Sequence, residues 1–387
     1  MQKLIVVIGA GGHGWESLRS FFDYRPESHY FKLYTQTTDW GGFTGLLGRL
    51  MEYNDGELNY LLHGNKIQVL PWGDTNKRVG FYLARQYGVQ VAQTMDLRSY
   101  HIWDLKQEFL ILSDFLALEQ TTINQFNVYL ETFYKYFNQS AETLPYITPP
   151  CLGSLWNQYL YWQTGSLQSW NEFYNSKHSS PENLEFLFTS EVREELIVES
   201  SDSYLSLVGE DVIDKHPSPI DPASLVIKNV KHSQFQVNSD FLENLQKADL
   251  IIIPNGSLAN WIPLVNISEV QSCLKQKASE NKLIWLLNLF HTSNEHKIHK
   301  YISYLDSLGV NPIIIGPKNP EKQPSAEILN NYHNEQKFLN LKTAQDIEKI
   351  ANFGNNIVLD LDFNLDYTYK YTPESVRDSI LKIFHDW

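Results

Sequence analysis

Apolar runs alternate with helix-like segments along most of the chain. Strands covered on both faces are predicted by uninterrupted apolar runs, at residues 4–8, 31–34, 250–253, 283–287, 312–315 and 357–361. Helices are predicted where apolar residues recur at three- and four-residue steps, at residues 15–24, 43–53, 75–87, 268–280, 295–308, 343–352 and 373–385. Because strands and helices alternate, we expect an α/β fold with a mostly parallel sheet.

Aromatic residues change the pattern between residues 99 and 180. Leu, Phe, Tyr and Trp recur at helical spacing over residues 103–118, 123–137 and 152–174. We expect this segment to be a helical insert that packs through its aromatic rings. The chain is therefore divided into the first part of the core at 1–98, the insert at 99–180 and the remainder of the core at 181–387. Residues 176–248 are polar and mixed, with short β-like runs at 195–199 and 224–230.

The charge balance of the chain is acidic. It has 31 Lys and Arg against 45 Asp and Glu, a net charge of −14, and 42% of its residues are hydrophobic. This composition is typical of a folded soluble protein and argues against binding to nucleic acid or to a membrane surface. Its two cysteines, Cys151 and Cys273, are too few for a disulfide framework. No segment reaches the roughly 18 apolar residues of a membrane span, so we expect a cytoplasmic protein.

A glycine-rich loop follows the first predicted strand and opens a predicted helix. It matches Gly-x-Gly-x-x-Gly, and its candidate ligand-binding residues are Gly9, Gly11, Gly12, His13 and Gly14. Such a loop brings backbone N–H groups close to phosphate oxygens at a helix N-terminus. The motif alone does not distinguish NAD, FAD and a nucleotide sugar. A dinucleotide site also needs an acidic residue at the tip of the second strand, and Asp39 lies several residues beyond it.

Three further loops carry candidate residues. They lie at 37–45, 71–76 and 253–258, and their candidates are Thr38, Asp39, Gly41, Gly42, Asp74, Asn76, Asn255, Gly256 and Ser257. The last loop directly follows a predicted strand, and ligands of open parallel sheets bind at the carboxyl ends of strands. Hydroxyls, amides and carboxylates in such loops suit a phosphate or metal contact. Asp74 has an alternative role as the cap of the helix that follows it.

The order of these loops resembles the CofD/YvcK superfamily. The glycine-rich first loop is followed by Asp39-Trp40-Gly41-Gly42, by Asp74-Thr75-Asn76, and by the strand 248–253 leading into Asn255-Gly256-Ser257-Leu258. Asn288-Leu289 resembles the end of the next strand. The resemblance runs from residue 4 to about residue 310. It implies a Rossmann-like three-layer core that holds a nucleoside diphosphate or nucleotide sugar, and Gly41-Gly42 with Asp74-x-Asn76 resembles the YvcK-like branch more closely.

Departures from the family pattern bear on its chemistry. Trp40 replaces the second residue of an Asp-Asp pair, Ser154 replaces the Asn of a Gly-Asn pair, and Thr75 replaces an Arg. A Mg²⁺ ion would therefore depend on Asp39 and Asp74 as its carboxylate ligands. We expect a YvcK-like regulatory protein that binds a UDP-sugar or a related nucleotide.

Two alternatives follow from the same loops. A CofD-like Mg²⁺-dependent transferase would move a phospho-hydroxyacid group from a nucleoside diphospho donor to a deazaflavin-type acceptor. An NAD or FAD oxidoreductase would rest on the first loop alone. Exposed aromatic faces of the insert would also suit a homo-oligomer.

Overall fold

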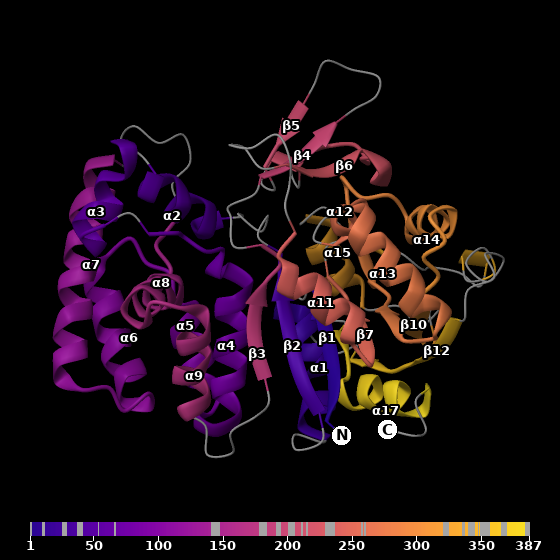
Figure 1. Ribbon diagram of the computed structural model, residues 1–387, viewed down its shortest axis with the longest axis horizontal. Helices are drawn as coiled ribbons and strands as arrows, with labels where there is room; N and C mark the ends of the chain where they lie inside the picture. Colours follow the sequence, from indigo (N-terminus) through magenta and orange to yellow (C-terminus); the bar gives the residue numbers. More distant parts are fainter. Residues whose placement is uncertain are drawn as a thin grey trace. The chain divides into compact units, whose positions relative to one another are not determined.

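The computed structural model divides the chain into two compact units (Figure 1). Unit 1, the sheet unit, comprises Met1–Thr38, Asn183–Ser190 and Glu194–Trp387, and unit 2, the helical unit, comprises Asp39–Glu182 and Glu191–Arg193. The structure describes residues 2–9, 12–24, 29–36, 42–52, 54–65, 67–140, 148–177, 184–190, 195–199, 206–209, 212–213, 216–228, 237–256, 258, 261–319, 325–334, 337–339, 345–346, 348, 357–364 and 370–383.

Seven parallel strands form the main sheet within the described residues of the sheet unit. Their order across the sheet is β12-β10-β8-β7-β1-β2-β3. The strands are β1 Lys3–Ile8, β2 His29–Thr35, β3 Leu184–Phe188, β7 Leu250–Ile253, β8 Leu283–Leu286, β10 Ile313–Pro317 and β12 Ile357–Leu361. The predicted α/β class with a parallel sheet is confirmed, and all six predicted core strands are present.

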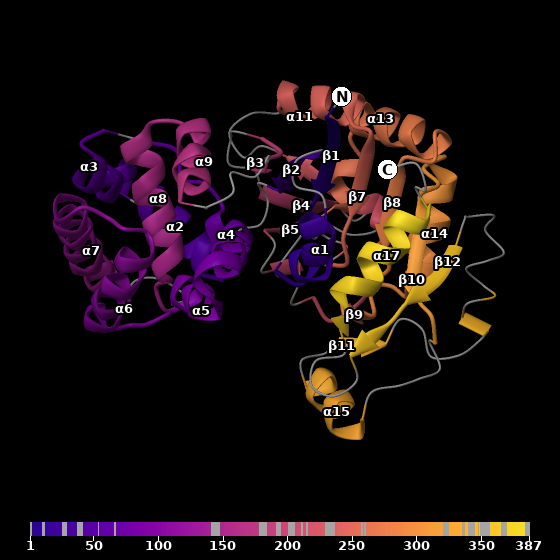
Figure 2. The same cartoon turned by 90° about the horizontal axis from the view of Figure 1, so that it is seen from below.

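Helices cover both faces of this sheet (Figure 2). Helices α1 (Gly12–Tyr24) and α17 (Pro373–Ile383) lie on one face, and α11 (Ser239–Lys247) and α13 (Ser268–Ser279) lie on the other. The step from β1 to β2 runs in the opposite direction to the step from β7 to β8. Since parallel crossovers are right-handed, this reversal places α1 and α13 on opposite faces and produces three layers.

Alternate residues of the central strands pack on different helical layers. Val6 and Ile8 of β1 lie in one buried cluster with Ile251, Trp285 and residues of α11 and α13. On the opposite face, the rings of Trp15 and Phe22 stack 4.5 Å apart. A strand buried on both faces does not alternate between apolar and polar residues. The uninterrupted apolar runs in the sequence therefore predicted these strands.

Smaller elements complete the sheet unit. An antiparallel sheet has the order β5-β4-β6, and two further strand pairs are β9 with β11 and β13 with β14. The remaining elements are β4 Glu195–Glu199, β5 Ser206–Val208, β6 Leu225–Lys228, β9 Phe290–Thr292, β11 Lys337–Leu339, β13 Phe363–Asn364, β14 Lys370–Tyr371, α12 Ile262–Val265, α14 Ile298–Ser307 and α15 Ala326–Asn334.

The helical unit follows β2 in the chain and precedes β3. It contains α2 Gly42–Glu52, α3 Glu57–His63, α4 Trp72–Tyr87, α5 Val89–Asp96, α6 Ile102–Phe115, α7 Gln120–Ser140, α8 Leu152–Thr164 and α9 Leu167–Ser176. Its core is aromatic, as the sequence indicated: Phe109, Phe126 and Trp156 lie with ring centroids 4.2–5.3 Å apart. The unit begins earlier than the insert predicted at 99–180, because α2, α4 and α5 pack with α3 and α8 inside it.

Some elements differ from the prediction. The helix expected over 152–174 is divided into α8 and α9 at Gly165, whose φ of +74° ends α8 in the left-handed conformation. Strand β3 and helix α11 lie in the mixed segment 176–248, where polar residues obscure the periodicity. The helix expected at 343–352 falls largely outside the described residues. None of the described helices has the length and apolar character needed to cross a bilayer.

A histidine is buried in the aromatic core of the helical unit. The His63 ring lies 5.1 Å from that of Trp162 and 5.7 Å from that of Tyr129. Its Nδ1 donates to Asn59 Oδ1 at 2.8 Å, because the Asn59 amide nitrogen already donates to Ile67 O. The other ring nitrogen, Nε2, is buried without a partner among the described residues. Burial lowers the pKa of His63 to about 4, so the folded protein holds this ring neutral.

We predict that acid destabilises the helical unit through His63. A folded-state pKa of about 4 lies below the unfolded value of 6.5, so stability is lost as pH falls below 6.5. The expected loss between pH 7.5 and pH 5.0 is about 2 kcal/mol. Urea unfolding at the two pH values measures it, and His63→Phe should remove this part of the pH dependence. The exposed His101→Gln serves as the control; an unchanged pH dependence in His63→Phe would contradict the prediction.

Candidate functional site

The strand order reverses direction between β1 and β7, in the middle of the sheet. From β1 the chain proceeds outward to β2 and β3, and from β7 it proceeds outward to β8, β10 and β12. The loops that leave the carboxyl ends of β1 and β7 therefore run toward opposite faces, which opens a crevice at this point in proteins of this architecture. Two of the four candidate loops, 9–14 and 253–258, follow these two strands.

Gly9 begins the first loop. Its N–H donates to Tyr34 O at 3.0 Å, so β1 and β2 remain paired up to this point. Its φ of +69° is in the left-handed region, where a residue with a Cβ atom is strained. The chain turns here directly from the strand toward α1.

Gly14 brings the first and the fourth loop together. A Cβ atom at this position would lie 2.8 Å from Pro254 Cβ and 3.0 Å from Asn255 O. Helix α1 therefore approaches the loop after β7 closely enough to require glycine. Asn255 Oδ1, in the same loop, is buried without a hydrogen-bond partner among the described residues.

Asn288 holds the fourth loop from the end of the next strand. This side chain, two residues after β8, accepts from Gly256 N at 2.9 Å and donates to Gly256 O. The Asn288 amide therefore bonds the N–H and the C=O of Gly256, as a residue of a paired strand does. These bonds extend the connection between β7 and β8 beyond their last residues. The sequence singled out Asn288 as a strand-end residue without assigning this contact.

Glu295 fixes the far side of the same loop. Its buried carboxylate accepts from Leu258 N at 2.8 Å and from Thr292 N at 3.1 Å. Charge-assisted bonds to backbone N–H groups are strong in a buried setting. Glu295 was expected at the start of a helix, and nothing in the local sequence indicates that this acidic residue is buried.

The other candidate residues of the first, second and fourth loops fall partly inside and partly outside the described residues. Gly12 and His13 lie in the first turn of α1, and Gly42 begins α2. The remaining candidates fall outside the described residues, namely Gly11, Thr38, Asp39, Gly41 and Ser257. Their assignment to a ligand stays a prediction.

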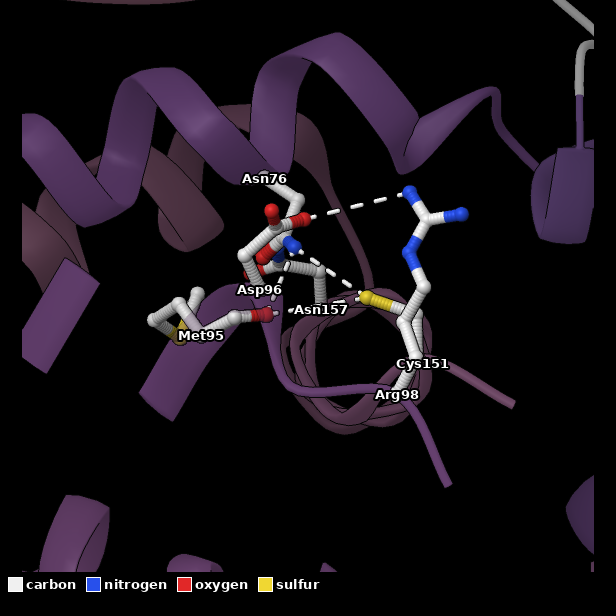
Figure 3. A network of polar contacts seen from close by, with 6 residues as sticks. All are labelled: Asn76, Met95, Asp96, Arg98, Cys151 and Asn157. Atoms are coloured by element: carbon white, nitrogen blue, oxygen red, sulfur yellow. Dashed lines mark hydrogen bonds and ion pairs between the residues drawn. The ribbon is translucent and has the colours of Figure 1, made fainter. Parts of the chain in front are cut away.

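The third loop belongs to the helical unit. Asp74 is the third residue of α4, and the N-cap is Pro71 without a side-chain cap, so Asp74 does not cap the helix. Asn76 is buried and points into a polar network (Figure 3). Its Nδ2 donates to Met95 O at 2.8 Å, and its Oδ1 accepts from Asn157 Nδ2 at 3.4 Å.

Cys151 and Gly153 complete this network at the start of α8. The Cys151 thiol lies 3.4 Å from Asn76 Nδ2 and 3.6 Å from Met95 O. Burial raises the pKa of this thiol, so it is a neutral packing group and not a nucleophile. A Cβ atom on Gly153 would lie 1.8 Å from Asn76 Oδ1. Two family-like positions far apart in sequence, Asn76 and Gly153, are thus in contact inside the helical unit.

The described residues contain no group of three or more His, Cys, Asp or Glu side chains arranged to hold a metal ion. Asp74 is the one predicted metal ligand among them, since Asp39 lies outside. Mg²⁺ bound largely through phosphates needs only one or two carboxylates, so the donor set does not conflict with such an ion.

Comparison with known proteins finds similarity of fold. No protein-family model matches the chain, and no curated protein matches it by sequence. Two crystal structures of protein BH3568 from Bacillus halodurans match it with a TM-score of 0.62 at 18% and 17% identity. Each match covers 98% of this chain and 100% of BH3568. BH3568 is described as a member of the UPF0052 family, which is the CofD/YvcK-like family, so the predicted resemblance is supported at the level of fold.

We predict that Gly14→Ala displaces the loop at Pro254 and Asn255. Overpacking of this kind costs about 1–3 kcal/mol of unfolding free energy. Chemical denaturation measures the loss. The control is Gly209→Ala in the same unit, where a Cβ would meet nothing within 4 Å and only its φ of +92° opposes the change. A Gly14→Ala protein as stable as wild type would contradict the close approach.

We predict that Asn288→Ala loosens the fourth loop. The variant leaves Gly256 N–H and C=O without their partner, and should lose about 1–3 kcal/mol of stability. Hydrogen exchange of peptides that cover residues 254–258 should become faster.

Asn266→Ala is the matched control, because the Asn266 side-chain amide also forms two hydrogen bonds to backbone groups: its Nδ2 donates to the carbonyls of Pro222 and Leu225. It should lose similar stability without faster exchange at 254–258. Equal exchange in both variants would show that Asn288 does not hold this loop.

Proposed function

We propose that the chain binds a nucleoside diphosphate or a nucleotide sugar at the carboxyl ends of β1 and β7. One observation carries the proposal: Gly14 brings the loop after β1 against Pro254 and Asn255, at the point where the strand order reverses. Both loops follow parallel strands at the place where open α/β sheets bind ligands. The diphosphate would lie against the N-terminal turn of α1, where backbone N–H groups and the helix dipole favour an anion.

The fourth loop supports the proposal through its rigidity. Asn288 and Glu295 hold Gly256 and Leu258 from two sides, so the loop has its shape before a ligand arrives. A pre-organised loop lowers the entropy cost of binding. The resemblance to the CofD/YvcK superfamily predicts Asp39 as a further ligand-binding residue.

Within this class we propose a YvcK-like ligand-binding regulator. The second candidate, a CofD-like transferase, depends on Mg²⁺ held by Asp39 and Asp74. Such an ion would neutralise phosphate charge when bound. The presence of Trp40 at the second position of the usual Asp-Asp pair favours the regulator, because it leaves one carboxylate fewer for the ion.

We predict one-to-one binding of a nucleotide by the purified protein, with Asp39 as a required residue. Isothermal titration with UDP-N-acetylglucosamine, GDP and NAD, each with and without Mg²⁺, measures it. Asp39→Ala should lower the affinity at least tenfold, since a contact with a charged group contributes about 1.5–3 kcal/mol. The exposed acid Asp114 provides the control variant Asp114→Ala.

Chromatography of the nucleotides after incubation separates the two candidates. An intact ligand supports the regulator, and Mg²⁺-dependent release of a nucleoside monophosphate or diphosphate supports the transferase. Wild-type affinity in Asp39→Ala would exclude Asp39 from the site, and no binding of any of the three ligands would overturn the proposal.

A further inference from the structure

Gln36 has a buried side chain whose polar atoms have no partner among the residues that the structure describes. It directly follows β2, and only 2% of its surface is exposed. Neither Oε1 nor Nε2 has a hydrogen-bond partner in the described part of the chain. Among the described residues, Gln36 alone has two such buried side-chain atoms. A buried amide that forms no hydrogen bond is a marked exception in folded proteins.

The position of Gln36 in the sheet is close to the proposed site. Strand β2 pairs with β1 in the register Tyr34 with Ile8, and Gly9 N–H still donates to Tyr34 O. Gln36 therefore lies at the same edge of the sheet as the phosphate-binding loop, one strand away. Neighbouring strands are about 4.8 Å apart, which is close to the distance from a phosphate to the sugar it carries.

Neighbouring polar groups do find partners. Tyr34 Oη accepts from Asn244 Nδ2 at 2.8 Å, and Thr35 O accepts from Thr189 N at 3.0 Å. The lack of a partner is therefore not a general property of the polar groups near the end of β2. At the end of β7, Asn255 Oδ1 also lacks a partner among the described residues, so a second amide oxygen at the carboxyl edge is available to a ligand.

We propose that Gln36 hydrogen-bonds the ribose hydroxyls of the bound nucleotide and so selects ribonucleotides. The inference rests on the proposed function. In sheets of this order, the residue at the tip of the strand after the glycine-rich loop reads the ribose, and dinucleotide sites use an acidic residue there. An amide offers one acceptor and two donors, and a hydroxyl can both donate and accept. A neutral amide can therefore hydrogen-bond the ribose hydroxyls without adding a negative charge next to a diphosphate.

The test compares ribose with deoxyribose ligands. UDP and 2′-deoxy-UDP, and GDP and 2′-deoxy-GDP, are titrated into wild type and Gln36→Met. Wild type should bind the ribose form of its ligand at least tenfold more tightly than the deoxy form. Gln36→Met should bind the two forms with nearly equal affinity, no tighter than wild type binds the deoxy form.

Stability provides a readout that needs no ligand. Met has a similar size and no polar atoms, so Gln36→Met should raise the unfolding midpoint of the free protein while it weakens binding of the ribose form. A lower midpoint would mean that the amide is satisfied within the protein and would overturn the inference. Lys277→Met is the control, because Lys277 is also buried but donates to Ala248 O, just before the amino end of β7; it should leave the discrimination unchanged.

The outcomes separate the inference from the function on which it rests. If wild type binds none of the four ligands, the proposed function fails and the ribose contact fails with it. If wild type binds but does not discriminate, or Gln36→Met discriminates as wild type does, the proposed function stands and the inference is wrong. Equal weakening of both forms would assign Gln36 to another part of the ligand and would also overturn the ribose contact.

Discussion

The reversal of strand order between β1 and β7 is the constraint on which the sheet unit depends. Right-handed crossovers force α1 and α13 to opposite faces, so the loops after β1 and β7 diverge. The gap between diverging loops is closed at one place, where Gly14 lies against Pro254 and Asn255. A side chain at Gly14 would force these loops apart, and the carboxyl edge would lose its shape.

Side chains hold the loop after β7 by hydrogen bonds to its backbone N–H and C=O groups. Asn288 pairs with both polar groups of Gly256, and Glu295 accepts the N–H groups of Leu258 and Thr292. Asn288 follows β8, the neighbour of β7 in the sheet, so β7 and β8 are joined beyond the end of their pairing. The amide oxygen of Asn255 has no partner in the described part of the chain. The loop therefore combines a fixed backbone with an acceptor that no described residue uses.

The sequence predicted the buried strands well because their environment is uniform. Residues 250–253 and 357–361 were predicted with the bounds that the structure gives, since a strand covered on both faces is apolar at every position. Strand β3 was missed because it is an edge strand with buried and half-buried residues in alternation. The extent of the helical unit could not be predicted from the sequence. Helical spacing in α2 and α4 predicts amphipathic helices, but it does not indicate the elements against which they pack. The roles inferred for Glu295 and Gln36 rest on the burial of their side chains, and no local sequence pattern predicts that burial.

Asn76 and Gln36 show that membership of a family-like motif and evidence for a ligand contact need not coincide. Asn76 belongs to a motif, yet its amide bonds Met95 O and Asn157 inside the helical unit, and Gly153 is small because Asn76 Oδ1 occupies the space beside it. These contacts account for the two residue types by packing alone. Gln36 belongs to no motif, yet its amide lacks any partner in the described chain, at the edge where the strand order reverses. Since an unsatisfied buried amide is costly, a residue whose polar atoms lack partners is stronger evidence for a ligand contact than a motif residue whose atoms are already bonded.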